Sequence, residues 1–377
     1  MSKWDMVRLE EVCDILDSLR VPVTASDRKS GIYPYYGANG VQDYVSEYIF
    51  DDELVLLAED GGNFGSKTRP IAYRVSGKCW VNNHAHVLKA KPTIDVDYLC
   101  YSIMFYDVSK IISGTTRAKL NQAAMRKMTI PLPPLETQKQ IAKTLDTAAE
   151  LLALRKQQLA ELDNLIKSTF YDMFGDPEEN RNCWETNLLG DTADIVSGIT
   201  KGRKTSEANL IPIPYMRVAN VQDGRLNLTE IKQIDAVNSE IEKYRLIRGD
   251  LLMTEGGDPD KLGRCAIWNE EIPLCIHQNH IFRVRLNQGH VLPQFASFLI
   301  GSFYGKKYFL KAAKQTTGIA TINSKQLRNF PLLVPDIRLQ SKFAEIVTKI
   351  EEQKALVQKA SDETQHLFDS LMSEYFE

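Results

Sequence analysis

The 377-residue sequence contains no run of eighteen apolar residues, and it therefore predicts no membrane span. Its first residues, MSKWDMVRLEEV, lack the basic, apolar and small-residue segments of a signal peptide, so we expect a cytoplasmic protein. Only six cysteines are present, and none are spaced as C-x-x-C. This favours reduced, buried thiols over disulfides or a zinc site.

Recognisable catalytic motifs are also missing. There is no G-x-S-x-G, no Ser, His and acid arrangement, and neither the Asn-Pro-Pro-aromatic nor the F-x-G-x-G stretch of an adenine methyltransferase. The glycine-rich stretch from Glu59 to Pro70 is not a phosphate loop, because Ser66 separates the glycine from Lys67. The histidines have no acidic or cysteine companions at metal-ligand spacing. The sequence therefore predicts no catalytic residue, no metal site and no cofactor in this chain.

What the sequence does contain is a duplication. The run MRKMTIPLPPLETQKQIAKTLDTAAELL, which begins at Met125, is echoed by LRNFPLLVPDIRLQSKFAEIVTKIEEQ, which begins at Leu327. Superposing the two copies pairs Asn121 with Asn323, Arg126 with Arg328, Pro133 with Pro335, Gln138 with Gln340 and Ala142 with Ala344. Weaker matches pair Trp4 with Trp184, Gly61-Gly62 with Gly256-Gly257, and His86 with His280. A repeat of this kind indicates pseudo-twofold organisation.

Each copy ends in a heptad-patterned segment that predicts a long coiled-coil helix. The seam positions are Leu145, Leu152, Leu159 and Ile166 in the first helix, and Phe343, Ile350, Val357 and Leu371 in the second. Companion positions include Ile141, Ala148 and Leu162, and then Ile346, Ala360 and Leu367. Prolines mark both starts, and Gly175-Asp176-Pro177 ends the first helix. Thirty-eight helical residues make a rod of about 57 Å.

These patterns predict an α+β protein with two mixed α/β domains and two long helices. We expect the first domain at residues 1–134, a central helix at 135–175, the second domain at 176–335 and a carboxyl-terminal helix at 336–377. Two helices of equal length in one chain most simply pair with each other. Because the second must carry the chain back, the pair is expected to be antiparallel and to separate the domains.

Charge is unevenly distributed along the chain. The net charge is -3, but the two helical segments together hold -7, so the globular segments hold +4. Two stretches without any acid, residues 109–129 and 305–329, occupy the same place in the two repeats, just before each helix. A charge run is most often only a solvated surface. Here the duplication and the adjoining threonines favour contacts with phosphate groups.

Both repeats also carry a glycine turn followed by a basic residue, Lys67 in the first and Lys261 in the second, which lets backbone amides and a cation approach a phosphate. Asn and Gln amides near the histidines are the usual readers of adenine. Candidate base readers are Asn63, Asn83, Arg264, Gln278 and Asn279. The other candidate DNA-binding residues are Lys67, Arg69, Thr115, Thr116, Arg117, Lys119, Lys201, Arg203, Lys204, Lys261, Lys314, Thr316, Thr317 and Asn323.

Four features of the sequence together resemble the DNA specificity subunit of type I restriction-modification systems. They are the run PLPPLETQKQIA, the helix ending in FYDMFGDP, the echo of both at the carboxyl end, and YPYYGANGVQDY from Tyr33 to Tyr44. The second copy departs from this pattern at Pro335-Asp336-Ile337-Arg338. The resemblance implies a non-catalytic subunit whose two target recognition domains each read half of a bipartite site on double-stranded DNA. It implies helices that fix the spacer and dock two modification subunits, with restriction subunits joining the full complex.

Cofactors are implied only for those partners: S-adenosylmethionine in the modification subunit, and ATP with Mg in the restriction subunit. Two other classes of function remain open from the residues alone. One is an enzyme, which would need motifs that this sequence lacks. The other is a non-catalytic coiled-coil adaptor that binds protein and no nucleic acid. DNA affinity that falls steeply with salt would distinguish a DNA reader from an adaptor.

Overall fold

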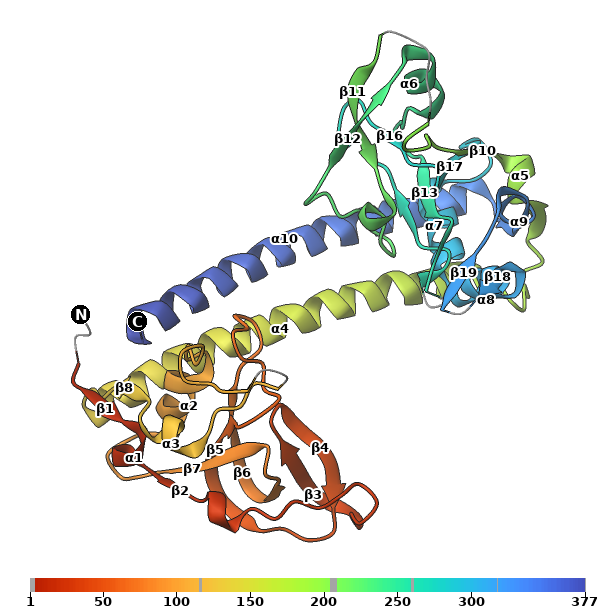
Figure 1. Ribbon diagram of the computed structural model, residues 1–377. Coiled ribbons are helices and arrows are strands. Elements are labelled where there is room, and N and C mark those ends of the chain that lie inside the picture. Colours follow the sequence, from red (N-terminus) through yellow and green to blue (C-terminus); the bar gives the residue numbers. More distant parts are fainter. Residues whose placement is uncertain (1–3, 115–116, 204–208, 259–260, 317, 377) are drawn as a thin grey trace. The chain divides into compact units, whose positions relative to one another are not determined.

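A computed structural model describes residues 4–376, apart from 115–116, 204–208, 259–260 and 317 (Figure 1). The chain forms two compact units: unit 1 comprises residues 1–157 with 357–377, and unit 2 comprises residues 158–356. Each unit contains a globular domain together with a segment of both long helices, α4 (Leu135–Phe174) and α10 (Ile337–Phe376). None of the helices in the described residues combines the length and apolar character of a membrane span.

Unit 1 is built on a six-stranded sheet with the order β2-β7-β5-β6-β3-β4, in which only β3 and β6 pair in parallel. A separate antiparallel pair joins β1 to β8. The strands are β1 (Met6–Arg8), β2 (Cys13–Ile15), β3 (Ser30–Gly37), β4 (Gly40–Val45), β5 (Phe50–Ala58), β6 (Ala72–Val81), β7 (Ala85–Ala90) and β8 (Thr129–Pro131). The helices are α1 (Leu9–Val12), α2 (Val96–Met104), α3 (Gln122–Arg126) and the 3₁₀ turn Asp17–Leu19.

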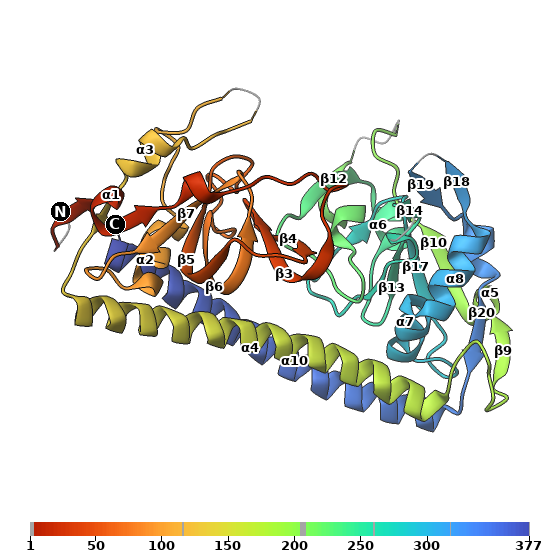
Figure 2. The same ribbon diagram turned by 90° about the horizontal axis from the view of Figure 1, so that it is seen from below.

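The central strand β5 explains why this sheet is buried on both faces. Its apolar run alternates between two clusters, because successive side chains of a strand point to opposite sides. Val55 and Leu57 pack with α2 and the start of α4, whereas Leu54 and Leu56 pack with β6 and β7. Figure 2 shows α2 against these strands. A continuous apolar strand therefore serves two cores at once.

Unit 2 divides its strands among smaller sheets. Their orders are β10-β17-β13-β15, β12-β11-β16 and β14-β19-β18, with β20 and β9 forming a pair. The strands are β9 (Glu185–Leu188), β10 (Ala193–Ser197), β11 (Ile211–Met216), β12 (Lys232–Ala236), β13 (Leu251–Thr254), β14 (Gly256–Gly257), β15 (Cys265–Ile267), β16 (Ile276–His277), β17 (Ile281–Leu286), β18 (Lys314–Thr316), β19 (Ile319–Thr321) and β20 (Pro331–Val334). The helices are α5 (Leu189–Thr192), α6 (Asn238–Tyr244), α7 (Pro293–Gly301), α8 (Phe303–Ala312), α9 (Ser324–Arg328) and the 3₁₀ turn Val218–Asn220.

The duplication predicted from the sequence is confirmed by matching hydrogen bonds. The side-chain amide of Gln138, at the start of α4, donates to the carbonyls of Thr93 and Pro133, while its oxygen accepts the backbone N–H of Asp95. In unit 2, the amide of Gln340 donates to His290 and Pro335 and accepts from Leu292. Both glutamines are fully buried. Each repeat therefore locks its long helix to its domain by the same buried amide.

Both long helices begin after the prolines, as the sequence predicts. α4 starts at Leu135, directly after Pro134, and ends at Phe174, where Gly175 adopts a positive φ of 77°. α10 starts at Ile337. Although the second copy lacks the first copy's Pro-Leu-Glu start, the Asp336 side chain accepts the backbone N–H of Arg338 at 2.8 Å. The aspartate therefore caps α10.

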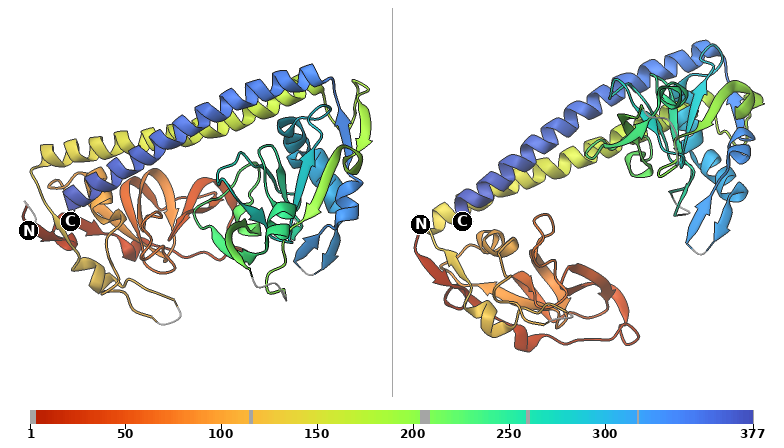
Figure 3. Two further views of the ribbon diagram at one scale, coloured as in Figure 1. Left: turned by 90° about the horizontal axis from the view of Figure 1, so that it is seen from above. Right: turned by 45° about the horizontal axis from the view of Figure 1, so that its top comes forward.

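The predicted antiparallel pairing of the long helices is seen within unit 2 (Figure 3). Phe170 and Phe174, at the end of α4, stack edge-on against Phe343 near the start of α10, with 5.5 Å between ring centroids. About two to three turns further back along α4, Asp163 pairs with Lys354, which lies further forward along α10. Contacts that move backward on one helix and forward on the other require opposite directions.

The predicted seam positions are buried or half-buried, but one companion position is wrong. Leu145, Leu152, Ile166, Phe343, Ile350 and Val357 are buried, while Leu159 and Leu371 are half-buried. Leu367 is 54% exposed, whereas Phe368 is buried in the core of unit 1. Leu367 and Phe368 are both large and apolar, so hydrophobicity alone could not choose the register. The expectation of six buried thiols also fails at Cys183, which is exposed.

Candidate nucleic-acid interface

In unit 1 the predicted glycine turn and the predicted basic stretch meet at the end of β5. Arg117 Nη2 lies 2.6 Å from Asp60 Oδ1, and Lys119 Nζ lies 3.0 Å from Glu59 Oε1. A backbone hydrogen bond joins the same two segments, since the N–H of Leu120 donates to the carbonyl of Glu59 at 2.7 Å. The Arg117 side chain is 60% exposed. We call the segments Glu59–Gly61, Asn82–His84 and Arg117–Leu120 the corner of unit 1.

Gly61 is the position at which this corner requires a glycine. Its φ is +63°, and a Cβ there would lie 2.7 Å from Nη2 of Arg117. Its carbonyl accepts the side-chain amide of Asn39 at 3.0 Å. Asn39 belongs to the turn between β3 and β4, within the YPYYGANGVQDY stretch. The glycine therefore lets a cation and a neighbouring turn approach the same backbone.

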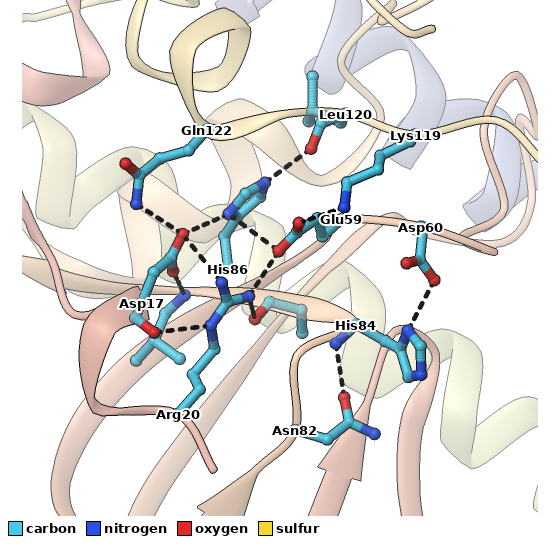
Figure 4. A network of polar contacts seen from close by, with 12 residues as sticks. Asp17, Arg20, Glu59, Asp60, Asn82, His84, His86, Lys119, Leu120 and Gln122 are labelled. Atoms are coloured by element: carbon cyan, nitrogen blue, oxygen red, sulfur yellow. Dashed lines mark hydrogen bonds and ion pairs between the residues drawn. The ribbon is translucent and has the colours of Figure 1, made fainter. Parts of the chain in front are cut away.

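His84 and the predicted base reader Asn83 complete the corner. Nδ1 of His84 lies 2.7 Å from Oδ1 of Asp60, and its backbone N–H donates to the Asn82 side chain (Figure 4). Asn82 is buried and bonded to Gln42, whereas the Asn83 side chain is exposed. Of the two adjacent asparagines, only Asn83 is placed to meet a partner outside the chain.

Behind this corner lies a buried network of charged side chains (Figure 4). His86 is fully buried, with Nδ1 2.6 Å from Asp17 and Nε2 2.8 Å from the carbonyl of Leu120. Arg20 lies 2.6 Å from Glu59. Burial opposes ionisation of Asp17, but hydrogen bonds from His86, the N–H of Val87 and Gln122 outweigh it and lower its pKa. Bonds from Arg20 and Lys119 likewise outweigh burial and lower the pKa of Glu59.

Asp17, Glu59 and His86 offer metal-ligand atoms that all lie within 4.8 Å of one another. Arg20 already lies between the two carboxylates, with Nη1 2.6 Å from Glu59 and Nη2 3.5 Å from Asp17. Lys119 adds a further positive charge at Glu59. These cations supply the charge that a metal ion would supply. The cluster therefore acts as a structural ion network that ties the corner to the sheet.

The remaining predicted residues of unit 1 lie on the loop after Gly61. The amide of Asn63 donates to the carbonyl of Pro70 at 3.4 Å, and the Ser66 hydroxyl accepts the backbone N–H groups of Thr68 and Arg69. Ser66, which rules out a phosphate loop, thus shapes this turn. Lys67 and Arg69 are exposed. Thr115 and Thr116 lie outside the described residues.

Unit 2 has a corner of the same construction. Gly256 and Gly257 form β14 and pair with Thr321 and Ala320 of β19, which in turn pairs with the strand that begins at Lys314. The approach at Gly256 is close, since a Cβ there would lie 2.6 Å from the Thr321 methyl group and 2.9 Å from the carbonyl of Ala320. We call the segments Glu255–Gly257, Gln278–His280, Lys314–Thr316 and Ile319–Thr321 the corner of unit 2.

Gln278 and Asn279, both predicted base readers, lie in this corner with half-exposed side chains. Their backbones are fixed, because the N–H of Gln278 donates to Met216 and that of Asn279 to Ile199, both at 3.0 Å. The next residue, His280, places Nδ1 2.7 Å from Oε2 of Glu255. Lys201 is exposed on the loop that follows Ile199.

Several side chains of unit 2 that the sequence predicts to bind DNA form hydrogen bonds or ion pairs with other residues of the chain. Arg203 makes a two-nitrogen contact with Glu240, which raises the pKa of Arg203. Arg264 donates to Gln222 at 3.0 Å, and Lys261 pairs with Asp258. The Asn323 side chain accepts the N–H of Gln326 and caps α9, as Asn121 caps α3. Lys204 and Thr317 lie outside the described residues, and only the backbone of Thr316 is described.

The hydrogen bonds also correct the weak alignment of the repeats. The N–H of Glu59 donates to the carbonyl of His84, and the N–H of Glu255 donates to that of His280. His84, not His86, is therefore the equivalent of His280. Neither histidine is among the contact residues predicted from the sequence. The signal that could have found them is the shared pattern of an amide pair followed by histidine, Asn82-Asn83-His84 and Gln278-Asn279-His280.

Comparisons with known proteins agree with this two-part organisation. A family model described as the type I restriction modification DNA specificity domain matches residues 1–164 and 182–365. A putative type I restriction enzyme specificity subunit of Haemophilus influenzae is 28% identical over 359 residues, which cover 91% of this chain and 86% of the relative. The EcoKI specificity subunit of Escherichia coli K12 is 23% identical over 316 residues, covering 80% of this chain and 67% of the relative.

Solved structures show the same fold at low sequence identity. The S subunit of a type I restriction-modification system from M. genitalium aligns with a TM-score of 0.63 at 14% identity, covering 100% of this chain and 96% of that one. A second chain, from work on complex assembly and conformational transition of the type I system, aligns with a TM-score of 0.54 at 14% identity, covering 99% and 97%.

Proposed function

Because the chain belongs to the family of type I restriction-modification DNA specificity subunits, we propose that each of its globular domains reads one half of a bipartite target on double-stranded DNA. As a specificity subunit the chain is non-catalytic, and catalysis lies in separate modification and restriction subunits. The observation that carries the proposal is the recurrence of one corner in both units. In each, a glycine turn at a strand end meets a basic segment and an amide-histidine pair.

The chemistry of each corner suits duplex DNA. Lys119 and Arg117 are exposed in unit 1, and Lys314 and Lys201 are exposed in unit 2. Such cations neutralise phosphates and position a protein on the duplex, whereas amide side chains discriminate base edges. We assign phosphate contacts to these cations and base contacts to Asn83, Gln278 and Asn279. Since the side chains around the two corners differ, the two half-sites should differ in sequence.

The long helices take the complementary role in this proposal. Residues 1–134 and 176–335 are the two target recognition domains, and the helices at 135–175 and 336–377 fix the length of the unread spacer. Forty helical residues span about 60 Å. The same helices dock two modification subunits, which bind S-adenosylmethionine and methylate adenine. Restriction subunits that use ATP and Mg complete the assembly.

DNA affinity measured against salt tests the proposal most directly. The chain is reconstituted with its modification subunits, and binding to duplexes carrying the methylated site is measured over a range of salt concentrations. We expect affinity to fall steeply with salt, because phosphate contacts release counterions. Replacing Arg117 and Lys119 together by Ala should weaken binding to all duplexes and reduce the salt slope by about 2.

The matched control is Lys139→Ala, which removes an exposed lysine on α4 that pairs only with Glu136 within the described residues. This variant should leave the salt slope unchanged. Absence of any DNA binding by the reconstituted complex would indicate an adaptor and refute the proposal. Loss of discrimination at one base pair from the Arg117 and Lys119 changes would instead move these residues from phosphate to base contacts.

The spacer role is tested by lengthening both helices together. One heptad is inserted after Asp163 in α4 and one after Lys354 in α10, since these residues face each other at 2.7 Å. Seven residues add about 10 Å, which is roughly three base pairs of duplex. We expect the methylated sites to keep both half-sites and to gain a longer spacer. An unchanged spacer in sites mapped by sequencing methylated DNA would refute the measuring role.

A further inference from the structure

We propose that His84 and His280 are equivalent base-reading residues, each of which contacts one base pair of its own half-site through Nε2. This inference rests on the proposed DNA-reading function and assigns it two residues that the sequence patterns did not. The two histidines occupy the same position in the repeat. Each carbonyl accepts the N–H of a glutamate at the adjacent strand end, Glu59 at 2.9 Å and Glu255 at 3.0 Å.

Further registers support this equivalence. The residues three positions before each histidine pair in parallel with β3 and β11, Val81 with Tyr36 and His277 with Met216. On the other side, the glutamate carbonyls accept the N–H groups of Leu120 and Ile322. The two histidines are thus fixed by the same backbone frame within their own domains.

Both rings are oriented by a carboxylate, but the carboxylate comes from different positions. In unit 1 Glu59 is engaged by Arg20 and Lys119, and the next residue, Asp60, bonds Nδ1 of His84 at 2.7 Å. In unit 2 the position equivalent to Asp60 is a glycine, and Glu255 itself bonds Nδ1 of His280 at 2.7 Å. The surrounding sequence has changed while the histidine-carboxylate pair has been kept. We infer that the orientation of the imidazole ring is what the function of both corners requires.

That orientation leaves one atom of each ring for a ligand. In the part of the chain that the structure describes, Nε2 of neither histidine has a hydrogen-bond partner. The side chains are 34% exposed for His84 and 57% exposed for His280. With Nδ1–H held by a carboxylate, Nε2 accepts a hydrogen bond from an exocyclic base amine when the ring is neutral and donates one when the ring is protonated.

A base edge fits these rings better than a phosphate. Exposed cations at the same corners already serve to contact phosphates, and in unit 1 one of them, Arg117, pairs with the same Asp60 carboxylate as His84. In unit 2 the Glu255 carboxylate beside His280 repels a phosphate. Reading a base requires a side chain held in one geometry, which the carboxylate provides. The exposed Asn83 and the half-exposed Asn279 directly precede the two histidines. In this proposal each asparagine enters the same DNA groove as the histidine that follows it. Asp60 and Glu255 are positioning residues in this scheme.

The test uses His84→Asn and His280→Asn in the chain reconstituted with its modification subunits. Asparagine can still donate to the carboxylate from the position of Nδ1, but it has no atom at Nε2. Binding is measured to a library of duplexes in which each position of both half-sites is randomised. We expect each variant to lose roughly 5- to 150-fold of discrimination at one base pair. His84→Asn should affect one half-site, and His280→Asn the other.

Several readouts separate this inference from its alternatives. Uniform weakening across all sequences would make the histidines phosphate contacts and overturn base reading, as would unchanged discrimination at every position. Unchanged hydrogen exchange in β5 and β13 verifies that the corners still fold. His290→Ala, an exposed histidine on the loop before α7, is the matched control and should change nothing. If the unsubstituted complex binds no DNA, the proposed function fails rather than the assignment of these residues.

Discussion

In unit 1 the strand position that faces Leu57 holds His86, whereas the equivalent position of unit 2, facing Met253, holds Phe282. The residue opposite follows the same division: Asp17 bonds His86, and Ser197 pairs with Phe282. One repeat therefore fills this site with a charged network, and the other fills it with an apolar core. The strand pairing around the site is the same in both units, so the same backbone arrangement accommodates charged side chains in unit 1 and apolar ones in unit 2.

The repeats differ at some equivalent positions and agree at others. Positions that attach the long helices keep identical chemistry, as Gln138 and Gln340 show. Positions behind and around the corners do not. The proposed function, in which the two domains read different half-sites, predicts variation of this kind. Substitutions at equivalent positions of the two units test this division.

The largest effect is expected at Asp17. Replacing it by Ala removes the acceptor for His86, for the N–H of Val87 and for Gln122. Breaking a buried charged pair in this way should cost unit 1 about 3–5 kcal/mol of unfolding free energy. Ser197→Ala at the equivalent position of unit 2 should cost less than about 0.5 kcal/mol, because Ser197 is exposed. Hydrogen exchange of β7 and β17 amides measures the two units separately.

The Asp17 carboxylate also makes the stability of unit 1 depend on pH in the acid range. Because its folded pKa lies below its ordinary value, ionised Asp17 stabilises unit 1 fully above the unfolded pKa of about 4. That stabilisation is lost as the pH falls through the folded pKa. The Asp17→Ala variant should lose this part of the acid dependence. Equal acid sensitivity of the variant and the parent would show that Asp17 is not ionised in the network.

A second pair of substitutions tests the shared part of the frame. Gln138→Ala and Gln340→Ala each leave one buried carbonyl, of Pro133 or Pro335, together with a part-buried carbonyl and a part-buried N–H, without a side-chain partner. We expect a cost of about 1–3 kcal/mol in each unit, since a buried polar group left unpaired is destabilising and water can partly satisfy the part-buried ones. Protection of the amides of α2 and α7 reports the two sites. Clearly unequal costs would contradict the view that the repeats attach their helices by one device.

A third prediction uses His277, which is fully buried and whose position in unit 1 is taken by Val81. Burial lowers the pKa of His277 to about 4. Between that value and the unfolded pKa of about 6.5, only the unfolded chain binds the proton, so stability rises with pH. Unit 2 should therefore lose about 2 kcal/mol between pH 7 and pH 5.

His277→Val should remove this pH dependence while keeping the fold, because the buried Nε2 has no partner in the described structure and valine occupies the equivalent site. Hydrogen exchange of the β17 amides in the variant and the parent at pH 7 and pH 5, corrected for the intrinsic pH dependence of exchange, gives the comparison for unit 2 alone. Persistence of the full loss in the variant would assign the pH dependence to another group.

Some of this architecture could be predicted from the sequence because its signals are local. The heptads and prolines mark α4 and α10, and the repeat of Gln138 at Gln340 marks the attachment of each helix. The choice of Phe368 over Leu367 could not be predicted, since both are large and apolar and only packing separates them. The Asp17–His86 contact joins residues sixty-nine positions apart, which no spacing rule anticipates. The same holds for the contact of His84 with Asp60.

The smallest effect is expected where the long helices pair in unit 2. Lys354 lies 2.7 Å from Asp163 and 2.8 Å from Glu351, but the two carboxylates are 63% and 51% exposed. Pairs this exposed contribute little, so Lys354→Met should change the unfolding free energy by less than about 1 kcal/mol. Methionine keeps the apolar stem of the lysine at the seam and removes only the charge. The unfolding free energy is measured at low and high salt. We expect the aromatic contacts of Phe343 with Phe170 and Phe174 to specify the register of the two helices. A cost well above about 1 kcal/mol would show instead that the ion pair of Lys354 specifies it.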